Sequence, residues 1–199
     1  WDVFGARALV DLEVPMDVPP PPEPDPDAIA RAVALLKNAK NPMITVGSGA
    51  IHAGAEVLEL AKLLQAPVTS HRSGRGIVGE DTPYGFSCGA GIKPWLTTDV
   101  LLGIGTRLEL QYLRWVKIPD GVKVIRIDID PTEMFRVRPD VGIVTDAKLG
   151  ARALVDALSA KLAKRPSREE EFKTLKAQFR QDIQSVQPQM GYLDVIREV

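Results

Sequence analysis

The chain has 199 residues, 45% of them hydrophobic and 26% charged, which is the composition of an ordinary globular protein long enough to bury a core. Its formal net charge of −1 argues against a nucleic-acid or anionic-membrane surface, because both need a positive excess. A single cysteine, Cys88, and two distant histidines, His52 and His71, exclude a disulfide framework and a zinc cluster. Without a membrane-length apolar run or a signal-peptide pattern, we expect a cytoplasmic protein.

The first predicted element is an extended connector. The run VPMDVPPPPEPDP at 14–26 cannot form a helix or a central strand, because proline fixes φ and removes a hydrogen-bond donor. Acidic residues interrupt it, so a spacer fits better than a proline-rich signalling ligand. After it, Asp27 is expected to cap a helix over 28–37.

A strand, a glycine turn and a helix follow at 43–46, 47–49 and 53–64. This order is typical of a phosphate cradle, since glycines admit an anion close to the backbone and a helix N-terminus attracts it. His52 stands where a dinucleotide fingerprint has its third glycine, and no ribose-binding acid follows at 68–71, which disfavours an ordinary NAD site. A tight turn with nothing bound remains the alternative.

The next strand is expected at 67–70, followed by a long glycine-rich loop at 71–91 that is functional or mobile. Its start, His71 to Gly76, concentrates positive charge and either meets a phosphate or is simply solvated. A short helix over 92–98 precedes an apolar run at 99–104, which predicts a strand covered on both faces.

Arg107 follows that strand in the sequence Gly-Ile-Gly-Thr-Arg. A cation at the carboxyl end of a central strand lies where open α/β sheets bind ligands, and it can pair with a phosphate or stack on a ring. The alternative is an exposed loop arginine. Residues 108–116 are expected to form a helix or an irregular lid.

The run VKVIRIDI at 122–129 is the strongest strand prediction, because β-branched residues dominate it. Asp130 and Glu133 then predict a helical capping box. Together with Asp128 they allow a magnesium cluster, but we favour the caps.

A strand at 141–145, a cap at Asp146 and an amphipathic helix over 149–162 complete the alternation of strands and helices. This alternation predicts a doubly wound, mainly parallel sheet with helices on both faces. A second capping box at Ser167 predicts a charged helix to about residue 185, and Pro188 should break it before a new apolar pattern begins at 190–199.

Five motifs in this order carry a resemblance to a known family: NPMITVGSGA at 41–50, APVTS at 66–70, DVLLGIGTRL at 99–108, VIRIDIDP at 124–131 and IVTDAK at 143–148. The set, covering residues 27–162, resembles the central domain of thiamine-diphosphate-dependent enzymes of the acetolactate synthase group. The resemblance implies a Rossmann-like, DHS-like NAD/FAD-binding type of fold. It also implies three segments: residues 1–26 as the tail of a preceding domain and a linker, 27–165 as the central domain, and 166–199 as a helical linker and the start of a following domain.

The parent enzyme implied by this resemblance is a homo-oligomer that acts on 2-oxo acids or related substrates, as a lyase or transferase. Thiamine diphosphate and Mg²⁺ would lie between the flanking pyrimidine- and diphosphate-binding domains of paired subunits. The family's activating glutamate and its GDG-to-Asn motif belong to those flanking domains, and this chain has no GDG run. We therefore expect neither a catalytic residue nor a metal ligand here, and an excised chain that is inactive alone.

Central domains of this family are structural in some members and bind FAD or ADP in others. The positions that match cofactor contacts are Gly47, Ser48 and Gly49 at the phosphates, Arg107 along the cofactor, and Asp128, Ile129 and Asp146 at the adenosine end. The segment Tyr84–Ser87 and the residues after Arg107 depart from the flavin-binding pattern. FAD, ADP and no ligand stay open, as does a self-standing FAD- or ADP-binding domain.

Overall fold

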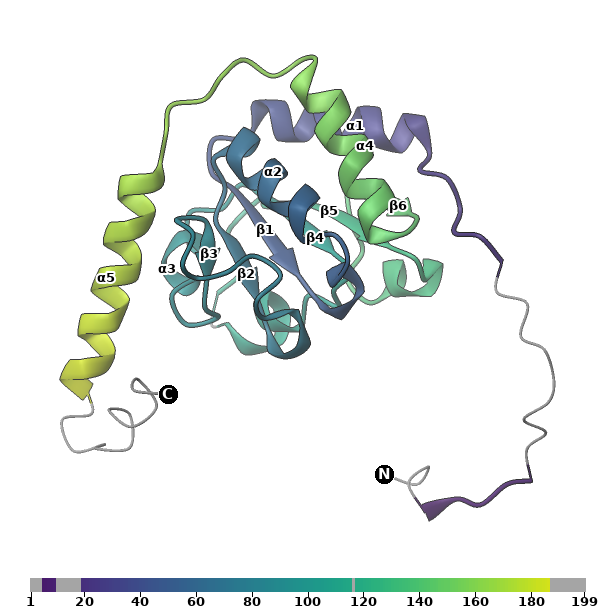
Figure 1. Ribbon diagram of the computed structural model, residues 1–199, viewed down its shortest axis with the longest axis horizontal. Coiled ribbons are helices and arrows are strands. Elements are labelled where there is room, and N and C mark those ends of the chain that lie inside the picture. Colours follow the sequence, from purple (N-terminus) through teal and green to yellow (C-terminus); the bar gives the residue numbers. More distant parts are fainter. Residues whose placement is uncertain (1–4, 10–18, 116, 187–199) are drawn as a thin grey trace.

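A six-stranded sheet forms the centre of the computed structural model, which describes residues 5–9, 19–115 and 117–186 (Figure 1). All its strand pairs are parallel, in the order β3-β2-β1-β4-β5-β6. The strands are β1 (Pro42–Val46), β2 (Val68–Ser70), β3 (Gly85–Phe86), β4 (Val100–Ile104), β5 (Lys123–Asp128) and β6 (Val141–Val144). The predicted doubly wound α/β fold is confirmed.

The strand order reverses at β1. From β1 the chain runs outward through β2 to β3, and then returns to place β4 on the other side of β1. Val46, the last residue of β1, pairs with Ser70 of β2 and with Ile104 of β4, so the three strands end at one level. The loops that leave these strands therefore diverge around a crevice at the carboxyl edge of the sheet.

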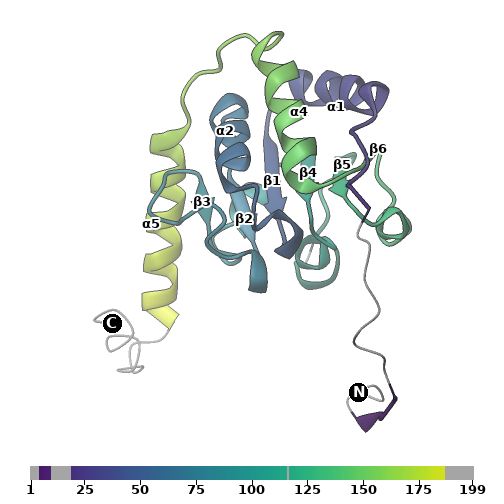
Figure 2. The same cartoon turned by 45° about the vertical axis from the view of Figure 1, so that its right-hand side comes forward.

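Three long helices cover one face of the sheet (Figures 1 and 2). They are α1 (Pro26–Asn38), α2 (Gly54–Leu64) and α4 (Ala147–Ser159), and α4 contacts both of the others. Their apolar stripes supply fully buried side chains such as Leu36, Leu60 and Leu154 to the main core. This burial is the largest stabilising term that the fold offers, since removing apolar area from water drives folding.

The start of α1 corrects one prediction. The helix begins at Pro26, and its cap is Asp25, whose side chain accepts a hydrogen bond from the Asp27 amide at 3.0 Å. Asp27 is thus inside the first turn. Proline suits the first helical position, because its φ is already helical and its missing N–H would have had no partner there.

The opposite face has a much thinner cover. Alternation along the strands sends Met43, Leu101 and Val124 to this side, where they pack with Trp95 and Leu108. Among the described residues, the helices on this side are the four-residue α3 (Ile92–Trp95) and a one-turn π-helix, η4 (Leu110–Arg114). The predicted helix or lid at 108–116 is this π-helix, and residue 116 lies outside the described residues. In and next to these two helices, large apolar side chains stay exposed at Ile92, Leu96, Leu113 and Ile118.

The last described helix, α5 (Glu169–Val186), runs beside β3 in both views (Figures 1 and 2). Phe172 is fully buried, and its ring centroid lies 5.9 Å from that of Tyr84 and 5.6 Å from that of Phe86. The Lys176 ammonium donates to the carbonyls of Glu80 at 3.0 Å, Thr82 at 2.6 Å and Gly85 at 3.3 Å. This helix therefore covers the outer edge of the sheet, which would otherwise present unpaired backbone groups.

Two predictions on flanking segments are refined. The glycine-rich stretch 71–91 was predicted without regular structure, yet it contains β3, which is too short to show a β-periodic pattern. The predicted helix after Ser167 is confirmed, and the Ser167 hydroxyl accepts from the Glu169 amide at 3.3 Å.

Residues 19–25 of the proline-rich run form no helix or strand, and the carbonyl of Pro22 accepts a hydrogen bond from the Thr145 hydroxyl at 2.6 Å. The predictions for 1–4, for 14–18 and for 187–199 fall outside the described residues. Among the described residues, none of the helices combines the length and the apolar composition needed to cross a bilayer.

Candidate functional site

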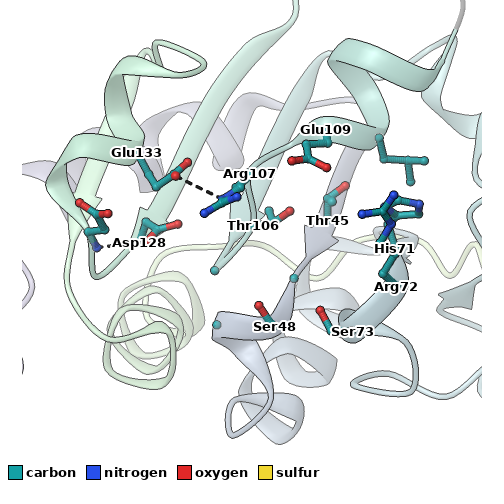
Figure 3. A pocket seen from close by; sticks show the side chains of 15 residues that line it. Thr45, Ser48, His71, Arg72, Ser73, Thr106, Arg107, Glu109, Asp128 and Glu133 are labelled. Carbon is teal, nitrogen blue, oxygen red and sulfur yellow. Dashed lines mark hydrogen bonds and ion pairs between the residues drawn. The ribbon is translucent and has the colours of Figure 1, made fainter. Parts of the chain in front are cut away.

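A cavity of about 420 Å³ opens at the carboxyl edge of the sheet, where the strand order reverses (Figure 3). Its walls come from the turn after β1, the start of the loop after β2, and the segments after β4 and β5. Its lining residues are Thr45, Gly47, Ser48, Gly49, His71, Arg72, Ser73, Gly105, Thr106, Arg107, Glu109, Leu110, Asp128, Asp130 and Glu133. Five of the seven predicted cofactor positions are among them.

The glycines of this cavity allow two backbone turns to touch. A Cβ on Gly47 would lie 2.3 Å from the carbonyl oxygen of Gly105, and a Cβ on Gly49 would lie 2.8 Å from the Gly105 Cα. Gly105 itself has a φ of +56°, and its Cβ would meet the Gly49 carbonyl carbon at 2.6 Å. No side chain fits at any of the three positions, so these glycines are explained by contact between the β1 and β4 turns.

The amides of the turn are mostly used within the protein. Gly47 N–H donates to Ile104 O at 3.2 Å and Gly49 N–H to Gly105 O at 3.1 Å, while Ala50 N–H donates to Gly47 O at 3.0 Å. An anion cradle needs such amides free to face the ligand. The polar group that the turn offers to the cavity is instead the hydroxyl of Ser48 (Figure 3).

Arginine side chains lie on two opposite sides of the cavity (Figure 3). His71 and Arg72 enter from the loop after β2, next to the hydroxyl of Ser73, and Arg107 enters from the segment after β4. Arg72 has a φ of +50°, a left-handed conformation that is unfavourable for a residue with a side chain. Backbone strain of this kind is concentrated at functional sites, and here it lies on the cavity wall.

Three arginine side chains surround the carboxylate of Glu133. Its carboxylate lies 3.3 Å from Arg107 Nε, 2.9 Å from Arg136 Nε and 3.7 Å from the buried Arg126 Nη2. The Arg136 hydrogen bond is the main reason that the pKa of Glu133 lies below its ordinary value, and the charges of the three arginines add to this. The predicted capping box is wrong on this point: Asp130 does cap the short 3-10 helix Pro131–Phe135, but the Glu133 side chain turns to the arginines.

Asp128, at the end of β5, is mostly buried beside this cluster. Its carboxylate accepts from the Asp130 amide at 3.1 Å and lies 3.9 Å from Arg126 Nη2. Burial nevertheless raises its pKa above the ordinary value, because desolvation penalises the charged form more than these contacts favour it. A half-desolvated carboxyl at this edge is suited to accept hydrogen bonds from ligand hydroxyls.

Two predicted positions do not line the cavity. Ile129 is 57% exposed, and the carboxylate of Asp146 caps α4 by accepting from the amides of Lys148 at 2.8 Å and Leu149 at 3.2 Å. The cap at Asp146 is confirmed. Within the described ranges, no group of three or more His, Cys, Asp or Glu side chains could hold a metal ion.

Several residues of the site carried no sequence signal. Thr45 lies inside β1, where its hydroxyl lies 2.9 Å from that of Thr69 and accepts from Gln111 Nε2 at 2.5 Å. Gln111 is fully buried, and its Oε1 has no hydrogen-bond partner among the described residues. A single polar residue within an apolar run is indistinguishable from an ordinary strand or lid residue in the sequence. Only the tertiary structure shows that these residues lie at or next to the cavity.

Comparison with known proteins places this geometry in a family. The family described as "Thiamine pyrophosphate enzyme, central domain" matches residues 29–154. A probable acetolactate synthase large subunit of Methanococcus aeolicus is 33% identical over 181 residues, which are 84% of this chain and 30% of that protein. A glyoxylate carboligase of Escherichia coli O157:H7 is 35% identical over 143 residues, 64% of this chain and 23% of that protein.

A solved structure agrees on the fold. Benzoylformate decarboxylase from Polynucleobacter necessarius superposes with a TM-score of 0.62 at 22% identity, covering 80% of this chain and 31% of that one. The chain thus spans about a third or less of the length of these proteins. The family match, the sequence relatives and the parallel sheet agree, and the chain belongs to the thiamine pyrophosphate enzyme central-domain family.

Proposed function

We propose that this chain is the non-catalytic central domain of an acetolactate-synthase-like enzyme, and that the parent performs decarboxylation or carboligation of 2-oxo acids. The family match over residues 29–154 carries this proposal. Thiamine diphosphate would supply carbanion stabilisation during C–C bond cleavage or formation. The chain does not fit that cofactor: its sequence has no GDG run, and the cavity carboxylates of Asp128, Asp130 and Glu133 are engaged by arginines and backbone amides.

In this proposal, flanking pyrimidine- and diphosphate-binding domains hold thiamine diphosphate and Mg²⁺ in a homo-oligomer. The exposed apolar side chains of the thin face, Leu96 and Leu113 among them, fit a surface that packs against other parts of such an assembly. A cytoplasmic location is part of the proposal, and so is the division of the chain at residues 26 and 165.

Isothermal titration of the chain with thiamine diphosphate and Mg²⁺ tests the non-catalytic role. We expect no heat of binding at micromolar to millimolar cofactor. Saturable binding with 1:1 stoichiometry would contradict the proposal, because the chain itself would then contain a cofactor site.

We further propose that the cavity holds the phosphates and ribose of ADP, or of the ADP portion of FAD. Arg107 and Arg72 would supply the positive charge, the hydroxyls of Ser48 and Ser73 would supply hydrogen bonds, and the Asp128 carboxylate would accept from the ribose hydroxyls. The cavity volume of about 420 Å³ falls within the usual range for small-molecule sites. In this proposal the nucleotide is bound by side chains and not by the backbone amides of the glycine turn.

Thermal unfolding with added ligand tests the nucleotide proposal. A ligand that binds only the folded state raises the melting temperature, so ADP and FAD should raise it while adenosine, which lacks phosphate, should raise it less. Coenzyme A, with its phosphorylated ribose, should be a weak ligand, because in this proposal the Asp128 carboxylate would face and repel the ribose phosphate. Unchanged melting with ADP, FAD and coenzyme A would contradict the nucleotide site and leave the structural role intact.

A further inference from the structure

Arg107 is an exposed cation of the cavity, and its side chain contacts a carboxylate of the protein. Its side chain is 63% exposed, yet its Nε lies 3.3 Å from Glu133, whose side chain is only 11% exposed. A long exposed arginine normally samples many rotamers. Here a mostly buried carboxylate fixes it at the cavity wall (Figure 3).

Glu133 is itself anchored from behind. The Arg126 side chain is 1% exposed and donates to the backbone carbonyl of Glu133, as well as to that of Val137 at 3.4 Å. Its other terminal nitrogen donates to the carbonyl of Thr106 at 2.7 Å. Arg126 therefore ties together the two segments that meet at the cavity, one carrying Arg107 and the other carrying Glu133.

The contact between Arg107 and Glu133 leaves the two terminal nitrogens of the Arg107 guanidinium available to bind a phosphate. A guanidinium has five donors in a planar fork, and the two terminal nitrogens can bind two oxygens of one phosphate. Glu133 lies against the Nε of Arg107, and no hydrogen bond from either terminal nitrogen to protein occurs in the described part of the chain. Glu133 thus orients the guanidinium through its Nε, and the two terminal nitrogens remain free to donate to a ligand.

We infer that Glu133 is a positioning residue, which orients Arg107 for the phosphates of a nucleotide in this cavity. The inference rests on the nucleotide site proposed above. Preorganisation of this kind raises affinity because less side-chain freedom is lost on binding. Glu133 contacts no ligand itself in this arrangement, and its effect passes through Arg107.

A double-mutant cycle with ADP as the probe tests this inference. Titration calorimetry compares the unsubstituted chain with Glu133→Gln, Arg107→Ala and the double variant. We expect Glu133→Gln to weaken ADP binding roughly fivefold to tenfold, and to have no further effect when Arg107 is already alanine. Equal weakening in both backgrounds would overturn the inference, because a merely structural role does not depend on Arg107.

Arg136 provides a matched control. It contacts the same carboxylate at 2.9 Å but does not line the cavity. Arg136→Ala should therefore change ADP affinity less than about twofold, whereas Arg107→Ala should change it more than tenfold. Equal effects of the two substitutions would count against a specific role of Arg107 and Glu133.

A second pair of variants keeps the test decisive if Glu133→Gln does not fold. Arg107→Lys and Arg136→Lys both preserve charge and lie on the surface, but lysine lacks the Nε that Glu133 holds. We expect only Arg107→Lys to weaken ADP binding. If the unsubstituted chain binds no ADP, the nucleotide site and this inference both fail; if it binds ADP and Glu133→Gln binds equally well, only this inference fails.

Discussion

The carboxyl edge of the sheet has two differently built halves. The first, which we call the glycine junction, consists of Gly47, Gly49 and Gly105, where two turns approach until no side chain fits between them. The second, the arginine cluster, consists of Glu133 and the three arginines around its carboxylate: Arg107, Arg126 and Arg136.

The comparison separates packing from recognition. The glycine junction has the sequence pattern of a phosphate cradle, but its amides bind protein carbonyls and its missing side chains make room for backbone. The arginine cluster has no such pattern, because Arg126 lies within an apolar strand and Glu133 resembles a helix cap. In this domain, therefore, the charge that can attract an anion comes from side chains held by other side chains.

Removing Arg126 should have the largest effect on the comparison. The substitution Arg126→Met leaves Glu133 and Asp128 without their buried cation and removes the side-chain donor from three backbone carbonyls. We expect a loss of about 3 to 5 kcal/mol in the free energy of unfolding, measured by urea denaturation. A loss below about 1 kcal/mol would show that the cluster is dispensable to the fold.

Gly105→Ala tests the glycine junction. Alanine would be strained at a φ of +56°, and its Cβ would lie 2.6 Å from the backbone of Gly49. We expect a loss of about 3 kcal/mol in the free energy of unfolding, seen as a lower urea midpoint.

Gly121→Ala is the control for that substitution. Gly121 also has a positive φ, of +71°, but nothing lies within 4 Å of the added Cβ. Its cost should be only that of the backbone conformation, about 1 kcal/mol. If both variants lost the same stability, backbone contact at the junction would not be the reason for Gly105.

The pH dependence of stability sharpens the comparison inside the arginine cluster. The folded pKa of Glu133 is lowered from 4.5, first by its hydrogen bond to Arg136. Its contribution to stability is therefore fully present above pH 4.5 and is lost as the pH falls through the folded pKa. We expect Glu133→Gln to be less stable than the unsubstituted chain at pH 7, with the difference shrinking toward pH 3.

The contribution of Asp128 to stability should change with pH in the opposite direction to that of Glu133. Burial raises its folded pKa from 3.8, so its relative contribution is present below pH 3.8 and is lost as the pH rises through the folded value. Asp128→Asn should therefore gain stability relative to the unsubstituted chain between pH 3 and pH 7. Parallel pH profiles for the two variants would contradict the assigned causes.

Ser48→Ala should give the smallest change. Ser48 is exposed, and its hydroxyl has no hydrogen bond to protein among the described residues. The free energy of unfolding should stay within about 0.5 kcal/mol. If the cavity holds a nucleotide phosphate, ADP affinity should fall nevertheless. A large loss of stability would mean that the turn depends on this hydroxyl.

Much of the fold follows from local patterns, and the errors have local causes. The strands at β1, β4 and β5 follow from β-branched and apolar runs, and the cap at Asp146 follows from its place before an amphipathic helix. Two aspartates flank Pro26, and the helical φ of proline makes Asp25, rather than the predicted Asp27, the cap. The two-residue strand β3 has no periodicity to detect, so only its pairing with β2 defines it.

The candidate site was predictable only where glycine and charge lie in the chain pattern. Gly47, Gly49, Arg107 and Asp128 stand at predicted strand ends, and parallel strands bring such ends to one edge. Thr45 and Glu133 belong to segments with other local explanations. Thr45 contacts Gln111, which lies 66 residues further along the chain, and Glu133 contacts Arg107, which lies 26 residues before it. Local sequence patterns do not reach over such separations.

By itself, the sequence determined the alternation of strands and helices and the family, because both depend on hydrophobic periodicity and on short ordered motifs. The tertiary structure alone decided which groups face the cavity. It shows that the glycine turn packs against backbone and that Arg107 contacts Glu133. The physical reason is that contacts between distant segments exist only after the sheet has brought the strand ends together.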